Sequence, residues 1–343
     1  MNKVAIVILN WNGVHFLKEF LPALVSYSTY PDTSIWVADN YSTDESVEFL
    51  DKQYPRIKQI RFNKNYGFAL GYQKALRQIE AEYFVLLNSD VEVTPGWLEP
   101  VIRLMDADNK TGACMPKILS YNGKDHFEYA GAAGGYIDKF GYPFCRGRIL
   151  NHIEKDMGQY NDTREVFWAS GACMFVRSEA YFKAGELDAD FFAHMEEIDL
   201  CWRLKNCGYK ILYTSESTVF HVGGGTLPNN NPRKLYYNYR NNLFLLYKNL
   251  PQGTLFFTLF RRMVLDGISG SIYLLQFSFS FFFAVVRAHL SFYRSLQKLR
   301  RKRKQNRIRN GKKLDKQIFP ESIVFNFLLK KRRTFDKLNF HPE

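Results

Sequence analysis

Hydrophobic and polar residues follow two different periods over the first hundred positions of the chain. The stretches 3–9, 34–38, 57–62 and 83–87 are short and strand-like, whereas the segments between them repeat apolar residues at every third or fourth position, as helices do. Strands that alternate with helices at this spacing form right-handed β-α-β units around a mostly parallel sheet. The pattern therefore predicts an α/β fold.

Polar residues directly follow three of these predicted strands, namely Asn10 and Asn12, then Asp39 and Asn40, then Asn88 and Asp90. Turns favour Asn and Asp for conformational reasons alone, so any one of these clusters is weak evidence for a site. In an open α/β sheet, however, the carboxyl ends of the strands line the ligand crevice. Three clusters at one edge therefore predict a common binding site.

The pattern changes after residue 110, where predicted strands become shorter and glycines and aromatic residues more frequent. Apolar patterning predicts a turn and strand over 167–176 and further strands over 209–213 and 218–222. Helical spacing predicts helices over 196–207 and 232–249.

Residues 267–286 form a run of 20 positions without a charge, long enough to be a transmembrane candidate. Glycine, serine and glutamine dilute this run, and a single span would place the basic residues that follow it across the membrane, against the positive-inside tendency. We favour helices that lie in the plane of the membrane surface, with the basic run 300–304 against anionic headgroups. A single span remains the alternative.

Charge is divided unevenly along the 343 residues. The chain has 47 Lys and Arg against 34 Asp and Glu, but residues 287–343 hold 18 basic and 4 acidic residues, or +14, which leaves 29 basic and 30 acidic, or −1, for residues 1–286. A near-neutral body argues against a nucleic-acid-binding surface. Five scattered cysteines without a C-x-x-C pair favour a reducing compartment, so we expect a cytoplasmic protein.

Several carboxylates are placed where they could act chemically. Asp90 and Glu92 at a strand end could hold a divalent cation, although solvated acid pairs are common. Glu196 and Glu197 begin a predicted helix; they could simply cap it, or one could serve as a general base with a pKa raised by its neighbour. His221 ends a strand before a glycine run and is either a structural hydrogen-bonding residue or a group beside phosphate or metal.

Asp199 and Arg203 stand four residues apart and are expected to pair on the surface of that helix. No G-x-G-x-x-G follows the first strand and no G-x-x-x-x-G-K-[ST] occurs, which disfavours a nicotinamide cofactor and a P-loop phosphotransferase.

Taken together, the motifs resemble those of the inverting glycosyltransferases of family 2, which have the GT-A fold, and especially their bacterial rhamnosyltransferase-like branch. The resemblance covers roughly residues 3–250, and its motifs occur in family order. They are VILNWNG (7–13), DNYSTD (39–44), NYGFALG (65–71), LLNSDV (86–91), SGAC (170–173), EEIDLCWR (196–203), GY (208–209) and HVGG (221–224).

The resemblance implies a GT-A domain over residues 1–250, with a nucleotide-sugar-binding half (1–110) and an acceptor and catalytic half (111–250). It is followed by amphipathic or membrane-associated helices (251–299) and a basic tail (300–343). A UDP- or dTDP-linked sugar is the expected donor, with Asp39 against the base. The residues expected to bind it are Asn10, Asn12, Asp39, Asn65, Gly67, Asn88, Ser89, Asp90 and Gly171.

The resemblance also implies a role for each acidic group. Asp90 corresponds to the last carboxylate of the family's D-x-D and would bind Mg²⁺ or Mn²⁺, with His221 in support and Glu92 as a weaker candidate. Glu197 corresponds to the catalytic base, with Glu196 beside it as the second catalytic candidate.

Two departures from the family pattern bear on these assignments. Asn88 replaces the first Asp of D-x-D, which would weaken metal binding. Glu197 is longer than the usual Asp, so the base could instead be Glu196.

The expected function is therefore transfer of a sugar, with rhamnose as first choice, to a hydroxyl of a glycan or lipid-linked acceptor in cell-surface polysaccharide synthesis. The enzyme is expected at the inner face of the cell membrane, held to its anionic surface by the C-terminal region, with no nucleic-acid partner. Two alternatives remain, namely a nucleotidyltransferase that makes nucleotide sugars and a non-catalytic membrane-associated scaffold that binds them.

Overall fold

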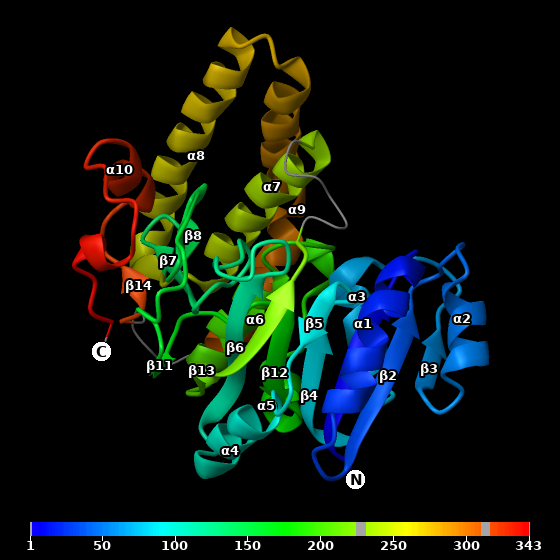
Figure 1. Cartoon of the computed structure of the whole chain (residues 1–343). Helices are drawn as coiled ribbons and strands as arrows, with labels where there is room; N and C mark the ends of the chain where they lie inside the picture. Colours follow the sequence, from blue (N-terminus) through cyan, green and yellow to red (C-terminus); the bar gives the residue numbers. More distant parts are fainter. Residues whose placement is uncertain (1, 224–230, 310–315, 343) are drawn as a thin grey trace.

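The computed structural model describes residues 2–223, 231–309 and 316–342 (Figure 1). Strands and helices alternate over the first part of the chain, as the hydrophobic pattern predicts. These elements are β1 (Asn2–Asn10), α1 (Val14–Tyr27), β2 (Thr33–Asp39), α2 (Ser46–Gln53), β3 (Lys58–Arg61), α3 (Gly67–Leu76), β4 (Ala81–Leu87), β5 (Val91–Val93) and α4 (Glu99–Ala107).

The second part of the fold adds shorter strands and the helix that begins with two glutamates. Its elements are β6 (Thr111–Ser120), β7 (Gly135–Asp138), β8 (Pro143–Cys145), β9 (Arg148–Ile149), β10 (His152–Ile153), β11 (Thr163–Glu165), β12 (Cys173–Arg177), α5 (Ser178–Lys183), η1 (Ala189–Phe191), α6 (Glu196–Asn206) and β13 (Lys210–His221). The two strands predicted over 209–213 and 218–222 are one strand, β13. A register shift between Thr214 and Thr218 interrupts its pairing with β6, which explains the apparent break in the sequence pattern.

The main sheet has the strand order β11-β13-β6-β12-β4-β1-β2-β3, and β5 pairs with β13. Strands β1, β2, β3, β4, β6 and β13 run in one direction, and β5, β11 and β12 run in the other. Residues 4–8 of β1 are buried because the strand lies inside the sheet, and Leu17, Leu21 and Leu24 of α1 are buried at helical spacing. The predicted α/β fold with a mostly parallel sheet is confirmed.

Three long helices follow the sheet domain. They are α7 (Pro232–Asn249), α8 (Gln252–Leu275) and α9 (Phe279–Arg309). In Figure 1, α8 and α9 run antiparallel as a hairpin whose far end extends beyond α7 and away from the sheet. Among the residues that the structure describes, none of the helices combines the length and hydrophobicity that a membrane crossing requires.

The last part of the chain packs against the body of the protein. Its elements are β14 (Ile318–Phe319), α10 (Ile323–Leu328) and η2 (Asp336–Leu338). β14 pairs with β7 in a second sheet of order β10-β9-β8-β7-β14, and the ring of Phe335 lies 5.2 Å from that of Tyr136. The expectation of a separate basic tail over 300–343 is therefore wrong for residues 316–342, because buried aromatic side chains hold this segment to the body.

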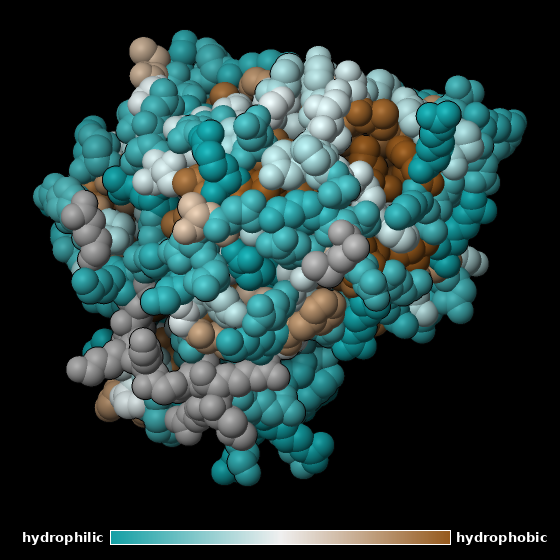
Figure 2. All heavy atoms as spheres, turned by 90° about the horizontal axis from the view of Figure 1, so that it is seen from below, coloured by the Kyte–Doolittle hydropathy of each residue, from teal (hydrophilic) through white to brown (hydrophobic). Residues whose placement is uncertain are grey.

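Two side chains of the basic run 300–304 are also bonded to the protein. The Lys302 ammonium forms an ion pair with Asp190 at 2.6 Å, and the Arg303 guanidinium donates to the carbonyl of Tyr247 at 2.7 Å. These two residues therefore do not face headgroups as expected. The side of the molecule opposite the hairpin is mostly covered by hydrophilic side chains, with hydrophobic ones in small patches between them (Figure 2).

Candidate functional site

The ends of β1 and β2 bring Asn10 and Asp39 together as predicted. The strands pair in parallel with Asn10 opposite Asp39, and the Asn10 amide donates to the Asp39 carboxylate at 3.3 Å. The other Asp39 oxygen accepts from the backbone N–H of Ser42 at 3.0 Å, and both side chains are buried. A Cβ on Gly13 would lie 2.6 Å from the Asn10 amide oxygen, so only glycine fits at this turn. The result is a fixed polar floor under the strand ends.

Asn12 and Asn65 lie at the rim of this floor, where they stabilise its loops. The Asn12 amide oxygen accepts from the backbone N–H of Thr43 at 2.7 Å, and that of Asn65 accepts from the N–H of Gly67 at 2.7 Å. The buried Asn40 links both sides, since its backbone N–H donates to the carbonyl of Asn10 at 2.7 Å and its amide group donates to Asn65 at 3.1 Å. Sequence analysis placed Asn40 in the second strand-end cluster but gave it no role in binding the donor.

The end of β4 meets the start of the antiparallel strand β12. The backbone N–H of Asn88 donates to the carbonyl of Ala172 at 3.0 Å, which places Asn88 beside Gly171. A Cβ on Gly171 would lie 3.8 Å from Cβ of Glu197, and one on Gly13 would lie 3.4 Å from the Ser89 hydroxyl. The predicted residues Asn88, Ser89 and Gly171 therefore converge on the same edge of the sheet as Asn10.

His221 lies between two carboxylates at this edge. Its Nε2 is 3.2 Å from Asp90 and 3.5 Å from the Asn88 amide nitrogen, and its Nδ1 is 3.4 Å from the buried Glu128 carboxylate. Burial alone would lower the pKa of His221, but the charges of Glu128 and Asp90 outweigh it and raise the pKa to about 10. Sequence analysis missed Glu128, which comes from a loop with no recognisable motif.

Asp90 and His221 fit a divalent cation in donor type, with one carboxylate oxygen and one imidazole nitrogen side by side, provided that the cation displaces a proton from the His221 ring. Within the described residues, no three His, Cys, Asp or Glu side chains are arranged as ligands of one metal ion. Further ligands would have to come from a diphosphate and from water. Of the glycines after His221, Gly224 and Gly225 lie outside the described residues.

Glu92 does not join this cluster, which corrects the weaker of the metal-ligand predictions. It lies opposite Phe220 in the pairing of β5 with β13, whereas His221 lies opposite Val91. Neighbouring residues of a strand point to opposite faces, so Glu92 and His221 face apart. The Glu92 carboxylate is paired instead with Lys124.

The segment that leads into α6 holds an unusual backbone. Phe192, His194 and Met195 have φ values of 65°, 69° and 73°, in the left-handed region that bulky residues rarely adopt. The amide of Asn241 on α7 donates to three carbonyls of this segment, including that of His194 at 2.7 Å. Helix α7 therefore holds the strained turn that places Glu196 and Glu197.

The two glutamates at the start of α6 differ in burial. Glu196 is buried and Glu197 is half-buried, and each has a carboxylate oxygen with no hydrogen-bond partner. Burial, together with the charge of Glu197, raises the pKa of Glu196 well above its usual range. Burial raises the pKa of Glu197 to about 7, although backbone N–H groups at the helix start favour its charged form.

The expected pair of Asp199 and Arg203 forms, at 2.8 Å, but it is buried rather than on the surface. Asp199 also accepts from Lys248 and Asn249 of α7, both at 2.8 Å. Burial alone would raise the pKa of Asp199, but Lys248 and Arg203 outweigh it and lower the pKa. This network fixes α6 to α7 and leaves Glu196 and Glu197 as the groups of the cluster without a cation.

The polar strand ends and the turn before α6 meet at Gly67. This residue has φ 72°, and a Cβ there would lie 2.6 Å from the Phe192 ring. The next backbone N–H, of Phe68, donates to the carbonyl of Phe192 at 2.9 Å. The start of α3 and the strained turn before α6 are thus in direct contact, which brings Glu197 to the same edge as Asn10 and Asp90.

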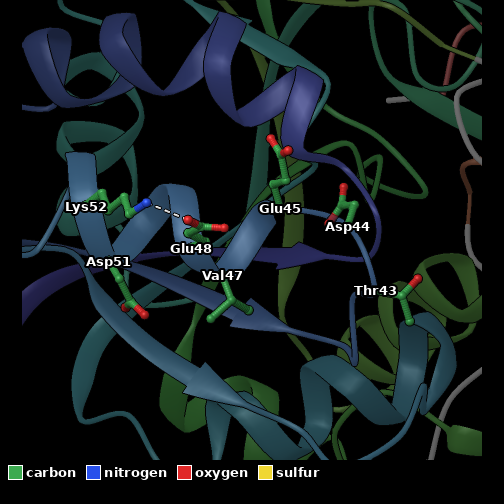
Figure 3. Close-up of a pocket in the computed structure, with 7 residues that line it drawn as sticks. All are labelled: Thr43, Asp44, Glu45, Val47, Glu48, Asp51 and Lys52. Atoms are coloured by element: carbon green, nitrogen blue, oxygen red, sulfur yellow. Dashed lines mark hydrogen bonds and ion pairs between the residues drawn. The ribbon is translucent and has the colours of Figure 1, made fainter.

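A separate hollow lies beside α2 and is drawn in Figure 3. Its walls carry four carboxylates, and its one cation, Lys52, is paired with Glu48. An acidic hollow repels phosphate groups, so it does not suit a nucleotide. The strand-end site is the better candidate.

Comparisons with known proteins identify the family of the chain. Residues 5–183 match the family described as glycosyl transferase family 2. An N-acetylglucosaminyl-diphospho-decaprenol L-rhamnosyltransferase of Mycobacterium tuberculosis is 26% identical over 227 residues, which cover 61% of this chain and 72% of that protein. Rhamnosyltransferase WbbL of Escherichia coli is 25% identical over 161 residues, covering 47% of this chain and 60% of its own.

Solved structures of similar fold include GalNAc-T7 with UDP, GalNAc and Mn²⁺, with a TM-score of 0.56, 14% identity, and coverage of 72% of this chain and 48% of that one. Another is the mannosyltransferase PcManGT from Pyrobaculum calidifontis with GDP-Man and Mn²⁺, with a TM-score of 0.51, 12% identity, and coverage of 85% and 87%. The fold is that of the GT-A enzymes.

Proposed function

The chain belongs to glycosyl transferase family 2, and on this premise we propose that it transfers a sugar with inversion from a nucleoside diphosphate to an acceptor hydroxyl in cell-surface polysaccharide synthesis. The observation that carries the proposal is Glu197. It is a carboxylate with a pKa of about 7 and an unpaired oxygen, beside the strand ends that bind nucleotides in α/β sheets.

The donor would lie across the ends of β1, β2 and β4. Asp39 is buried and fixed by Asn10 and Ser42, so its carboxylate can accept hydrogen bonds from a uracil or thymine base without reorganising. Asn12 and Asn65 would shape the rim that surrounds the nucleotide, and Gly67 and Gly171 would let backbone approach the sugar.

Asp90 and His221 would hold Mg²⁺ or Mn²⁺ on the donor diphosphate, with the Asn88 amide beside them. The cation would supply charge neutralisation for the departing nucleoside diphosphate. Glu128 would fix the ring of His221 from its other nitrogen. Mn²⁺ in two solved structures of the same fold supports this assignment.

Glu197 would take the proton of the acceptor hydroxyl, whose oxygen attacks the anomeric carbon from the face opposite the leaving diphosphate. The C–O bond to the acceptor forms as the bond to the diphosphate oxygen breaks, so the configuration at the anomeric carbon inverts. Burial and the charge of Glu197 raise the pKa of Glu196 well above its usual range, which favours its protonated form, and in that form it could donate a hydrogen bond to substrate.

The names of similar proteins suggest the substrates. Two relatives are rhamnosyltransferases, and one of them acts on a diphospho-decaprenol carrier, so we propose rhamnose as the sugar and a lipid-linked glycan as the acceptor. An acceptor of this kind is held in a membrane, which would place the enzyme at the inner membrane face.

Substitution Glu197→Gln tests the proposal. We expect transfer from the cognate nucleotide sugar to fall by roughly a thousandfold, since general base catalysis contributes 10²–10⁴-fold. Donor affinity, measured by calorimetry with Mn²⁺, should stay near that of the wild type. Glu45→Gln, which changes an exposed glutamate beside α2, is the matched control. Full turnover by Glu197→Gln would show that another group is the base.

A further inference from the structure

The far end of the α8–α9 hairpin exposes large apolar side chains to solvent. Leu275, Phe277 and Phe279 are 78%, 81% and 51% exposed, and they surround the turn between the two helices. Figure 1 shows this end free of the rest of the protein, whereas the opposite side of the molecule in Figure 2 is mostly hydrophilic. Exposed apolar side chains also continue down α8 at Phe256, Phe260 and Val264, so the far end is the outermost part of a longer apolar surface of the kind that marks a contact.

This end of the hairpin is uncharged on all sides. Residues 267–286, which form the last turns of α8, the connection and the first turns of α9, contain no Asp, Glu, Lys or Arg. Exposed charges begin just outside this segment, at Arg261 on α8 and at Arg287 and Arg294 on α9. A protein interface or a flat membrane contact needs one apolar face. The end of a helical hairpin that carries no charge on any side is instead suited to insertion into lipid.

The backbone conformation of Phe277 also supports a contact with lipid. Its φ of 55° lies in the left-handed region, where glycine or asparagine is expected and a bulky side chain is strained. Since Phe277 is also almost fully exposed, neither the turn nor packing within the chain explains a phenylalanine here. Burial of its ring in lipid would.

The dimensions match one leaflet of a bilayer. From Gly267 to Leu275 the helix rises roughly 13 Å at 1.5 Å per residue, and half of a hydrocarbon core is roughly 15 Å. Asp266, at the lower limit of this segment, is buried and forms an ion pair with Arg262 at 2.7 Å, and the ring of His289 lies 3.2 Å from its other carboxylate oxygen. We infer that residues 267–286 insert as a hairpin into one leaflet of a lipid bilayer. Arg287, roughly 12 Å from Phe279 along α9, would then lie at the edge of the hydrocarbon, and Arg261, roughly 21 Å from Leu275 along α8, would lie among the headgroups.

Insertion at this depth differs from helices that lie in the membrane plane. Arg300 is 21 residues from Phe279 along α9, or roughly 30 Å, so the basic run 300–304 would stand well outside the headgroup layer. In Figure 1 the hairpin end and the carboxyl ends of the central strands lie on the same side of the sheet. Insertion would therefore turn the strand-end site toward the lipid surface. This orientation would bring the site close to a lipid-linked acceptor, a consequence that rests on the proposed function.

Vesicle flotation of the full chain tests the insertion. The vesicles contain phosphatidylcholine with or without phosphatidylglycerol, and neither donor nor acceptor is added. We expect Phe277→Asn to keep the fold, because asparagine tolerates the left-handed region, and to weaken binding by roughly tenfold, since one buried aromatic side chain is lost. Phe256→Ser, on the near half of α8 and 72% exposed, is the matched control and should bind like the wild type.

A second measurement reports depth directly. Phe277→Trp should be quenched by lipids brominated deep in their acyl chains, and Phe256→Trp should not. Wild-type binding to neither vesicle, or Phe277→Asn binding like the wild type, would overturn the inference. An equal loss in Phe256→Ser would show a hairpin that lies flat. A dimer that Phe277→Asn dissociates, with no vesicle binding, would show that a second copy covers this surface.

The result is separate from the proposed function. Transfer to a water-soluble acceptor should be the same for Phe277→Asn and wild type, because this residue lies far from the strand ends. A wild-type protein that transfers sugar but does not bind vesicles would refute the insertion alone. A wild-type protein that binds vesicles but does not transfer sugar would refute the transferase alone. Point variants are preferable to deletion of the C-terminal region, which would remove the α7–α9 packing and β14.

Discussion

The start of α6 and the end of the α8–α9 hairpin leave opposite kinds of group without a partner. At α6, carboxylate oxygens of Glu196 and Glu197 are buried with no hydrogen bond, although unpaired buried polar groups destabilise a fold. At the hairpin end, Leu275 and Phe277 are exposed to water although apolar burial drives folding. In both places the backbone is also left-handed at bulky residues, at Met195 and at Phe277.

The difference shows what each place can bind. An unpaired buried carboxylate gains from a proton or a donor group, so the start of α6 suits a substrate hydroxyl. An exposed apolar end gains from leaving water, so the hairpin suits lipid. Ion pairs join the long helices to the α6 region. Lys302 of α9 is paired with Asp190 in η1, and Lys248 of α7 is paired with Asp199 in α6.

At the strand-end site, the largest expected effect after that of Glu197→Gln comes from substitution of Glu128. If this carboxylate orients His221 for a cation, Glu128→Ala should weaken Mn²⁺ binding by 10–100-fold, as loss of a supporting partner usually does. Glu128→Gln keeps an acceptor oxygen, so its affinity for Mn²⁺ should lie between those of the wild type and of Glu128→Ala. Calorimetric titration with Mn²⁺ in the presence of donor measures the effect. Equal affinities in all three proteins would remove Glu128 from the site.

The pH dependence of transfer sharpens the assignment of Glu197. A base must be deprotonated to act, so kcat/KM should rise about tenfold per pH unit below the pKa of about 7 and level off above it. The residual activity of Glu197→Gln should lack this step. A profile that is flat between pH 5 and 7 would contradict an essential base with this pKa.

Glu196 allows a test through stability rather than activity. Its folded-state pKa is raised, so the folded protein binds the proton more tightly than the unfolded chain, and stability is lost as pH rises above the unfolded value. Glu196→Gln should therefore raise the free energy of unfolding at pH 8 by about 1–2 kcal/mol. A higher melting temperature than that of the wild type would report this gain. The gain should vanish near pH 4. A destabilised variant at pH 8 would indicate that the Glu196 charge is favourable.

The smallest effect concerns the charges at the hairpin. Arg287→Gln should weaken binding to phosphatidylglycerol vesicles by about fivefold, since a basic residue near the surface contributes about 1 kcal/mol. Binding to phosphatidylcholine alone should not change. Arg301→Gln, an exposed arginine at the other end of α9, is the control and should have no effect. A larger loss in Arg301→Gln would favour helices that lie in the membrane plane.

Sequence periodicity was sufficient for the sheet and for most of the site. The spacing of apolar residues predicted β1 to β4 and their helices, because a buried strand and an amphipathic helix each require their own period. The same pattern placed Asn10, Asp39 and Asp90 at one edge, where parallel strands end together. The structure places all three there.

Contacts between distant segments could not be predicted in this way. Glu128 faces His221 because of the path of a loop 93 residues before His221, and Glu92 turns away because of the pairing of β5 with β13. The buried position of Asp199 depends on α7, and the attachment of residues 316–342 depends on β7. None of these partners has a fixed spacing in the sequence.

Sequence alone thus determined the α/β fold, the family resemblance, the strand-end polar cluster and the uncharged run 267–286, because each is a local pattern of residue types. Only the tertiary structure decided that Glu196 and Glu197 are buried without a cation, and that the uncharged run is divided between the last turns of α8 and the first turns of α9. The physical reason is the same in both cases. Burial and exposure are properties of surroundings, and surroundings are set by segments far apart in the chain.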